Sequence, residues 1–497
     1  MLELTTATDV AKRKGAGATI LPVWESTGSK KGGVLACPDD PSLKGAERPL
    51  ELGDFSGKAG KGDLVYTDGG KEKRFLLIGL GKEGELTVEG LRQSYAAAVG
   101  IARSARLTSV NVLLPTVKGL SLSDVVRGIS EGLLLANESF DRLKFEKLKE
   151  ETILLKKACL VGVPAKVAAE IESHLAVAEG VHFARDLINR NADDITPQGL
   201  GEIVKDLAKS TPKLKATVHG KEWIEKEKMG LLLAVNRGSA HDPAFIILEY
   251  KGSPKGKKHT VIVGKGVTYD TGGLNLKPTG HMETMRTDMS GAAAVIGTLL
   301  AVAKLGLKVN VTAVVAATEN MIDARSYKPG DVYSARTGKT VEIDNTDAEG
   351  RLTLADALSY AIDKLNPTEV INLCTLTGAI VVALGEEIAG LMSNNDELAA
   401  DLVQAGETSG ELLWRMPLHK SYKKMLHSDI ADIKNCGGRK GSSITAALFI
   451  GEFVGKTPWA HLDIAGTAYP DKAAPLSPNR ATGYGVRLLI DLLRERG

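Results

Sequence analysis

Two acids and an arginine occupy alternate positions in the segment "NTDAEGRL", Asn345–Leu352. Asp347 and Glu349 could together hold a cation. An apolar helical pattern begins directly after them, and Thr346 and Glu349 also have the Thr-x-x-Glu spacing of a capping box. In a capping box these side chains would bond to free backbone N–H groups at the start of the helix. The segment by itself leaves both interpretations open.

A second segment, "GKGVTYDTGGLNLKPTGHMETMRTDMSGAAAV", begins at the carboxyl end of an apolar strand pattern. Among its charged residues are Lys265, Asp270, Lys277 and Asp288, which stand amid glycines and small residues. A single charge in such a loop is usually solvated. Asp288, however, directly precedes a helix pattern so apolar that it must be buried, and an unpaired buried charge costs several kcal/mol. The combination therefore favours a site over a surface loop.

Carboxylates on the strand-end loops of one sheet could converge: Asp270, Asp288, Asp347 and Glu349. Two divalent ions would neutralise these four charges, and two metals roughly 3.5–4 Å apart form a known hydrolytic device. Lys265 could join them only as a neutral amine. Carboxylate ligands favour Mn, Mg or Zn. The sequence contains no H-E-x-x-H, which excludes the helical single-zinc protease motif.

Two other motifs resemble phosphate-binding loops, but their contexts are wrong. "GLGKEG", Gly79–Gly84, lies between a strand and a helix, yet Pro115 and Thr116 follow the next strand, where a ribose-binding acid is needed. "GKT", Gly338–Thr340, has Tyr333 in place of the first P-loop glycine and precedes a strand pattern. We expect a glycine-rich turn at the first motif and no nucleotide cofactor at either.

The composition is that of a globular protein with 43% hydrophobic and 25% charged residues. A chain of 497 residues is expected to form two domains. The net charge of +2 gives no reason to expect nucleic acid or an anionic membrane as partner. The lysine-rich stretch 255–258 is expected to be a solvated loop.

Targeting signals and cysteine pairs do not appear in the sequence. The N-terminal residues lack the apolar core of a signal peptide. The most apolar stretches, 292–307 and 370–385, are too short and too polar to span a membrane. The four cysteines are far apart, which fits a reducing compartment. We therefore expect a cytoplasmic protein without a membrane segment.

Short apolar runs alternate with helical patterns along the whole chain. Strands are predicted at 74–80, 110–114, 153–162, 244–250, 259–266, 308–318, 369–378 and 459–466. The pattern predicts an α/β fold with a smaller N-terminal α/β domain, 1–164, and a larger C-terminal α/β domain, 191–497, around a mainly parallel sheet. A helix at 165–190 is expected to connect them. Ligands of such sheets bind beyond the carboxyl ends of the strands.

Several segments, in order, resemble the signature segments of the leucyl aminopeptidase family, the M17 cytosol aminopeptidases. They are "GKGVTYDTGGLNLKP", "MRTDMSGAAAV", "NTDAEGRL", "TLTGAIVVALG", "SDIADIKNCGGRKGSSITAALFIGEFV", "WAHLDIAG" and "TGYGVRLL". The resemblance covers most of the second half and only weakly the first. Arg286 and Ala481 depart from common family residues, but neither is a metal or catalytic position.

The resemblance implies a role for each matching residue. Asp270 and Glu349 would bridge two metal ions, Asp347 would complete one site, and Lys265 and Asp288 the other. Two further residues would be catalytic: Lys277, which polarises the scissile carbonyl, and Arg351, which holds a bicarbonate. Four residues would lie near the pocket for the first side chain of the substrate: Met285, Thr375, Leu376 and Gly378.

The implied protein is a hydrolase that releases N-terminal amino acids, leucine preferred, from peptides. It would carry two divalent ions per subunit, Mn or Zn with Mg as an alternative, and form a homohexamer. Two alternatives of other classes remain: an oxidoreductase using Gly79–Gly84, and a DNA-binding role of the N-terminal domain. Titration with NAD(P) and a mobility-shift salt series would detect them.

Overall fold

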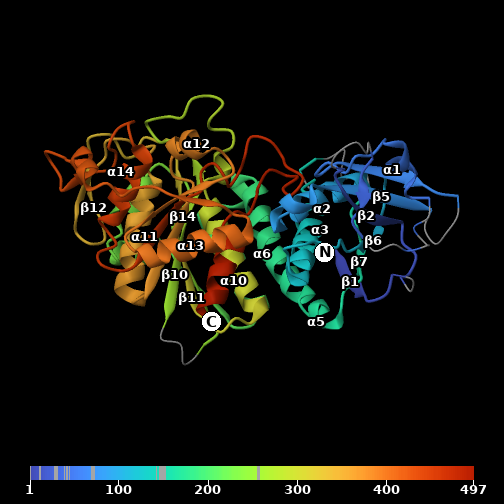
Figure 1. The fold of residues 1–497 in the computed structure, drawn as a ribbon. Helices are drawn as coiled ribbons and strands as arrows, with labels where there is room; N and C mark the ends of the chain where they lie inside the picture. The colour runs from blue at the N-terminus through green and yellow to red at the C-terminus, as the bar shows by residue number, and fades with distance from the viewer. Residues whose placement is uncertain are drawn as a thin grey trace. The chain divides into compact units, whose positions relative to one another are not determined.

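The computed structural model describes residues 2–10, 13–26, 32–37, 40, 43, 45–68, 73–141, 143–144, 153–253 and 258–497. Most of the lysine-rich stretch 255–258 lies outside these residues. The chain forms two compact units (Figure 1). Unit 1 comprises Met1–Ala178 and Lys472–Arg480, and unit 2 comprises Glu179–Asp471 and Ala481–Gly497.

Unit 1 is built on a seven-stranded sheet with the order β1-β7-β6-β2-β5-β4, and β3 pairs with β2. Its strands are β1 (Glu3–Ala7), β2 (Ala18–Trp24), β3 (Val34–Leu35), β4 (Gly62–Tyr66), β5 (Arg74–Gly81), β6 (Ser109–Leu113) and β7 (Lys157–Val161). Its helices are α1 (Arg48–Leu52), the 3-10 helix η2 (Glu83–Glu85), α2 (Val88–Ser104), α3 (Leu122–Ala136) and α5 (Ala165–Ala168). Four of the strand pairs are parallel, and β3 and β4 pair antiparallel with their neighbours.

Gly79, the first glycine of the "GLGKEG" segment, lies within β5 and serves close packing of the backbone. A Cβ atom at Gly79 would lie 2.0 Å from the carbonyl oxygen of Lys58. The neighbouring chain segment therefore approaches this strand so closely that only glycine fits. This contact explains the glycine without a nucleotide.

Unit 2 contains an eight-stranded sheet with the order β16-β15-β18-β14-β10-β11-β9-β8. Its strands are β8 (Leu214–His219), β9 (Ala244–Lys251), β10 (His259–Asp270), β11 (Asn310–Asn320), β14 (Glu369–Cys374), β15 (Ala389–Ser393), β16 (Leu413–Arg415) and β18 (Trp459–Asp463). The central strands β11, β10, β14 and β18 are mutually parallel, as their continuous apolar sequences predict. A small second sheet joins β12 (Val332–Ser334), β13 (Thr340–Glu342) and β17 (Ile433–Lys434).

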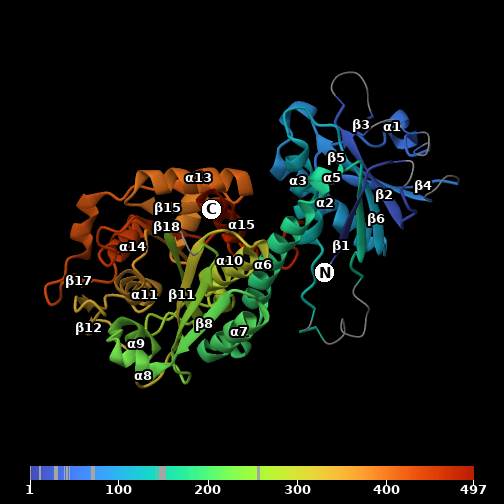
Figure 2. The ribbon, with the colours of Figure 1, turned by 90° about the horizontal axis from the view of Figure 1, so that it is seen from below.

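Helices cover both faces of the eight-stranded sheet, as Figure 2 shows. On one face α10 (Ser290–Leu305) packs against β10, β11 and β14, and α7 (Pro197–Ser210) against β8 and β9. On the other, α11 (Gly350–Leu365) and α9 (Gly230–Asn236) pack against the central strands. The other helices that reach into or lie within unit 2 are α6 (Ile171–Asn189), η3 (Ala192–Asp194), α8 (Lys221–Lys226), η4 (Met285–Thr287), α12 (Gly378–Leu384), α13 (Asp396–Ser409), η5 (Lys420–Leu426), α14 (Ser442–Gly451) and α15 (Val486–Arg496).

The segment expected as one helix at 165–190 forms two helices, α5 and α6, with 169–170 between them. Within unit 2, a Cβ at Gly180 of α6 would lie 2.5 Å from the carbonyl oxygen of Gly297 in α10. These two helices therefore meet through glycines at both positions.

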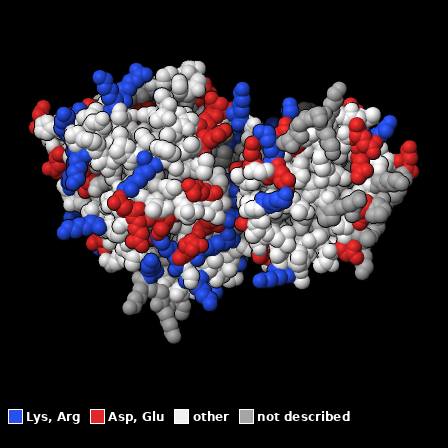
Figure 3. Space-filling model, viewed as in Figure 1, with Lys and Arg blue, Asp and Glu red and all other residues white. Residues whose placement is uncertain are grey.

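No described helix has the length and apolar character needed to cross a membrane. On the face drawn in Figure 3, basic and acidic side chains lie interspersed.

Candidate active site

One pocket of about 410 Å³ lies at the carboxyl ends of the central parallel strands of unit 2. All of the proposed metal ligands line it: Lys265, Asp270, Asp288, Asp347 and Glu349. Lys277 and the four residues expected near the substrate side chain line it too: Met285, Thr375, Leu376 and Gly378. Of the predicted site residues, only Arg351 is not part of the lining.

The local fold explains how the charged residues meet. β10 carries Lys265 and ends at Asp270, and the loop beyond it carries Lys277. Glu349 directly precedes α11, whose first residue, Gly350, lies under the Lys265 side chain. A Cβ at Gly350 would lie 2.7 Å from Lys265 Nζ, so the glycine makes room for the lysine.

The two lysines each bridge two carboxylates. Lys265 Nζ lies 2.8 Å from Asp288 Oδ1 and 2.7 Å from Glu349 Oε1. Lys277 Nζ lies 2.8 Å from Asp270 Oδ2 and also contacts Asp347 Oδ1. Four carboxylates against two ammonium groups leave a formal charge of −2 in a pocket whose ligand side chains are mostly buried.

The pKa values of the acids reflect this crowding. Burial, together with repulsion from Glu349, raises the pKa of Asp347 to about 6. Burial also raises the pKa of Asp270 and of Asp288. Burial opposes ionisation of Glu349 as well, but Lys265 and Lys277 lower its pKa. Ionisation of Asp270, Asp288 and Asp347 is therefore opposed as long as the two lysines are the only cations beside them.

These residues fit divalent cations. Oxygen atoms of Asp270, Asp347 and Glu349 all lie within 4.8 Å of one another, close enough to share an ion. Asp288 Oδ2 is buried and has no hydrogen-bond partner among the described residues, although buried polar atoms are normally paired. Hard and borderline metal ions prefer such oxygen ligands.

Lys265 is held as an ammonium group by its neighbours. Burial would lower its pKa, but the charges of Asp288 and Glu349 raise it above the ordinary value. Its Nζ also donates to the carbonyl oxygen of Thr375 at 2.9 Å. Ligation by this lysine therefore requires that a metal displace its proton.

Arg351 lies in the first turn of α11 and is 6% exposed. Its Nη1 donates to the carbonyl oxygen of Asn435 at 2.8 Å, while its Nε has no partner among the described residues. Burial lowers the pKa of this guanidinium. A buried cation with a free N–H group is suited to an anion.

The capping box does not form. Glu349 is the N-cap residue of α11, but its side chain makes no capping hydrogen bond. Thr346 Oγ1 donates instead to the carbonyl oxygen of Gly272 and accepts from the backbone N–H of Asn275. The Glu349 carboxylate therefore does not cap α11 and lines the pocket instead.

Thr375 contacts the acidic group as well as the pocket. Its Oγ1 donates to Asp288 Oδ1 at 2.7 Å. Thr375 therefore lies beside the metal-ligand candidates as well as in the pocket lining.

The remaining lining has an apolar part, here called the apolar wall, formed by Met285, Leu376, Gly378, Val381 and Ala465. Polar side chains lie beside it, among them His281, Thr284 and Thr377. Eight lining residues were not indicated by the sequence: Pro278, His281, Thr284, Thr287, Thr377, Val381, Ala465 and Tyr469. The Tyr469 hydroxyl accepts a hydrogen bond of 3.1 Å from Arg286 Nη2. Ala465 and Tyr469 follow β18, so their position after a strand predicted to be parallel could have indicated them.

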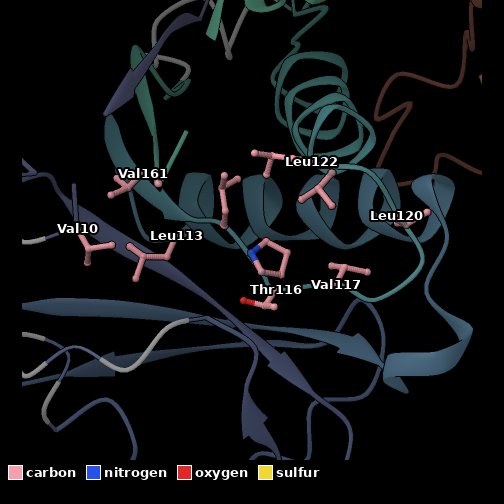
Figure 4. Close-up of a pocket in the computed structure, with 11 residues that line it drawn as sticks. Val10, Leu113, Thr116, Val117, Leu120, Leu122 and Val161 are labelled. Atoms are coloured by element: carbon pink, nitrogen blue, oxygen red, sulfur yellow. The ribbon is translucent and has the colours of Figure 1, made fainter. Parts of the chain in front are cut away.

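A second pocket, of about 310 Å³, lies in unit 1 beyond the ends of β6 and β7 (Figure 4). Its lining is apolar, for example Val10, Leu113 and Val161, and Thr116 is its one polar side chain. None of its lining residues carries a titratable side chain. Of these two pockets, the one in unit 2 is lined by the titratable side chains.

Comparisons with known proteins match both units. The sequence model of the cytosol aminopeptidase family, catalytic domain, matches residues 182–490, and that of its N-terminal domain matches residues 20–147. A "Probable cytosol aminopeptidase" of Protochlamydia amoebophila (strain UWE25) is 49% identical over 496 residues, which are 99% of this chain and 99% of that protein. One of Chlamydia caviae is 49% identical over 486 residues, 97% of this chain and 96% of that protein.

Solved structures resemble the whole chain. A mutant of tomato leucine aminopeptidase superposes with a TM-score of 0.88 at 34% identity, covering 100% of this chain and 97% of that one. The bottromycin maturation enzyme BotP, in complex with Mn, gives a TM-score of 0.85 at 32% identity, covering 97% of this chain and 99% of that one.

Proposed function

This chain belongs to the cytosol aminopeptidase family, and we propose that it releases N-terminal amino acids, preferably leucine, from peptides with the help of two divalent metal ions. The observation that carries the proposal is the pocket of unit 2. It joins an acidic, lysine-bridged end to an apolar wall.

Five side chains would hold the metals: Lys265, Asp270, Asp288, Asp347 and Glu349. Mn or Zn is proposed, with Mg as the alternative; the bound Mn of BotP supports a divalent ion of this kind. Bound there, such ions make hydroxide available near neutral pH and withdraw charge from a carbonyl group.

Lys277 is the proposed electrophilic residue. Its ammonium group, at the edge of the acids, is 15% exposed and can donate a hydrogen bond to the carbonyl oxygen of the substrate. As negative charge develops on that oxygen the hydrogen bond strengthens, and one such donor typically contributes about 2.7–4 kcal/mol to the transition state.

Arg351 is proposed to hold a bicarbonate ion, which supplies a general base beside the reaction centre. Its unpartnered Nε and the charge of its guanidinium support this role. Arg351 does not line the pocket, so it would act through the bound anion and not by contact with the side chain of the substrate.

The apolar wall is proposed to receive the first side chain of the peptide. Met285, Leu376 and Gly378 would contact it, with Thr375 at the boundary to the acids. A leucine side chain suits such a wall, because burial of each of its CH₂ groups contributes about 0.8 kcal/mol.

The test is the release of p-nitroaniline from Leu-p-nitroanilide before and after removal of metals with a chelator. We expect activity to disappear with the metals and to return when Mn²⁺ or Zn²⁺ is added. Full activity in protein shown by elemental analysis to be metal-free would contradict the proposal.

A blocked substrate tests the exopeptidase part. A free α-amine has a lone pair with which it could bind a metal ion held by the acids, whereas an N-acetylated nitrogen has none available. N-acetyl-Leu-p-nitroanilide should therefore be cleaved at least about 100-fold more slowly, the effect of losing about 2.7 kcal/mol. Equal cleavage of both substrates would indicate an endopeptidase.

We further propose a homohexamer located in the cytoplasm, with domains at 1–164 and 191–497 joined by 165–190. Sedimentation of the purified protein would test the assembly, because six copies of the 52.6-kDa chain have a mass of about 316 kDa. No nucleic-acid partner is proposed.

A further inference from the structure

Asn320 is the last residue of β11 and is fully buried. In the register of the sheet it lies beside Asp270, the last residue of the neighbouring parallel strand β10. The carboxyl ends of the two strands therefore bring this asparagine next to a proposed metal ligand. Neither its residue type nor its local sequence indicated a role.

The carboxamide of Asn320 makes two hydrogen bonds, both as a donor. Its Nδ2 lies 2.8 Å from Asp270 Oδ1 and 3.0 Å from the carbonyl oxygen of Thr346. Both partners can only accept, which fixes the orientation of the amide group. Its Oδ1 has no partner among the described residues, so the side chain is held here by its N–H groups.

These bonds determine which oxygen of Asp270 faces the pocket. Oδ1 also accepts from the backbone N–H of Gly272 at 2.9 Å. With two donors on Oδ1, the carboxylate cannot rotate freely, and Oδ2 is directed to Lys277 at 2.8 Å. A carboxylate whose orientation is already fixed loses little conformational entropy when it binds a cation.

The second bond reaches the other ligand loop. Thr346 immediately precedes Asp347, and its carbonyl oxygen also accepts from the hydroxyl of Tyr327 at 2.6 Å. Asn320 thus connects Asp270 on β10 to the loop that carries Asp347 and Glu349. The oxygen atoms that lie within 4.8 Å of one another belong to these three acids.

We propose that Asn320 is a positioning residue for the metal site, which holds Asp270 in register with Asp347 and Glu349. The inference rests on the proposed function, because it takes these acids to be metal ligands. Groups that orient metal ligands typically change metal affinity by 10- to 100-fold when they are removed.

A purely structural role is the competing explanation, and Asn372 offers a matched control. It too is a fully buried asparagine in the same sheet. Its carboxamide bonds to Trp459 and His461, each at 2.8 Å, and touches none of the proposed ligands. Asn372→Ala should lower stability in the same way as Asn320→Ala but leave metal affinity unchanged.

The experiment compares the full-length wild type with Asn320→Ala, Asn320→Leu and Asn372→Ala. Metal is removed, Mn²⁺ or Zn²⁺ affinity is measured by competition with a chromophoric chelator, and thermal unfolding of the metal-free proteins is recorded separately. Asn320→Leu retains the branching of the side chain, fills its space and lacks the N–H donors, so it is used if the cavity in the alanine variant prevents folding.

Both Asn320 variants should bind metal 10- to 100-fold more weakly than the wild type, and the metal concentration for half-maximal peptidase activity should rise by the same factor. Wild-type affinity in a folded Asn320 variant would overturn the inference. Equal weakening in Asn372→Ala, or failure of both Asn320 variants to fold while Asn372→Ala folds, would overturn it by showing a structural role. A wild type that binds metal but releases no amino acid would contradict the proposed function alone.

Discussion

In the pocket of unit 2, the acids outnumber the lysines, and the two lysines differ in their exposure to solvent. Four acids face two lysines, and each lysine lies between two acids. Lys265 is 3% exposed and lies among the ligand candidates, whereas Lys277 is 15% exposed at the pocket edge. The difference in exposure suits one lysine to the metals and the other to the substrate.

Lys277→Ala should lower kcat by about 10²–10³-fold, the effect of losing one donor to the developing oxyanion. Metal content should not fall, because loss of a positive charge makes the acidic site more attractive to cations. Steady-state kinetics and elemental analysis measure the two effects. Lys304→Ala is the control, since its ion pair with Glu179 lies at the surface and contributes little. Near-normal turnover in Lys277→Ala would remove this lysine from the mechanism.

The Glu349→Gln variant should bind less metal than the wild type, while helix α11 should remain folded. The side chain makes no capping bond at the start of α11, but it contacts Lys265 and lies within the group of acids. Elemental analysis should show reduced metal binding, while far-UV circular dichroism should match the wild type. Loss of helix with metals retained would restore the capping interpretation.

At the scale of elements, the loops that carry the ligands are fixed by buried asparagines. Asn435 Oδ1 accepts from the backbone N–H of Asp344 at 2.8 Å, and its Nδ2 donates to the carbonyl oxygen of Asn345 at 2.7 Å. Its own carbonyl oxygen accepts from Arg351. A single residue after β17 thus connects the ligand loop and the anion-binding candidate.

Asn435→Ala should therefore damage both stability and the site. It removes a hydrogen-bond partner of backbone groups in the 344–348 loop, and the loss at the buried carbonyl group of Ala348 costs about 1–3 kcal/mol. We expect a lower unfolding temperature together with weaker metal binding. The exposed Asn394 is a suitable control position, because its carboxamide bonds to backbone groups far from the pocket. Unchanged metal affinity in a destabilised Asn435→Ala would limit its role to folding.

At the scale of the whole molecule, the sequence predicted the central strands of unit 2 well because they are buried on both faces, whereas the equally buried β2 of unit 1 was not predicted. β10 and β11 are continuous apolar runs. Such runs are typical of strands in a parallel sheet that is covered by helices on both faces. The short strands β12, β16 and β17 were not predicted, since two or three residues carry no periodicity and their pairing depends on distant packing.

In the site, too, residues with a clear sequence pattern were predicted, whereas residues that depend on distant contacts were not. Acids and lysines after strand ends indicated the pocket, because charge is unusual next to buried helices. Asn320 and Asn435 gave no comparable signal, since a lone asparagine usually marks a turn. Their roles became visible only through strand register and loop contacts, which a single sequence does not specify.

Asp356 links the stability of the whole fold to pH. It lies in α11, away from the metal ligands, and accepts from the backbone N–H groups of Leu231, Leu232 and Arg336. It thereby attaches α9 and the turn after β12 to the helix that begins at the site. Burial raises the pKa of this carboxyl from its ordinary 3.8 to about 7, although the three N–H groups oppose the rise.

Because its pKa is raised in the folded state, the folded protein binds this proton more tightly than the unfolded chain does. The stabilising contribution is complete below about pH 4 and is lost as pH rises through about 7. Urea denaturation of metal-free protein should therefore show the stability of the wild type, relative to Asp356→Asn, decreasing from pH 5 to pH 8. The asparagine cannot titrate, so other ionising groups cancel in the comparison. A difference between the two proteins that stays constant over this range would show that the N–H groups keep Asp356 ionised throughout.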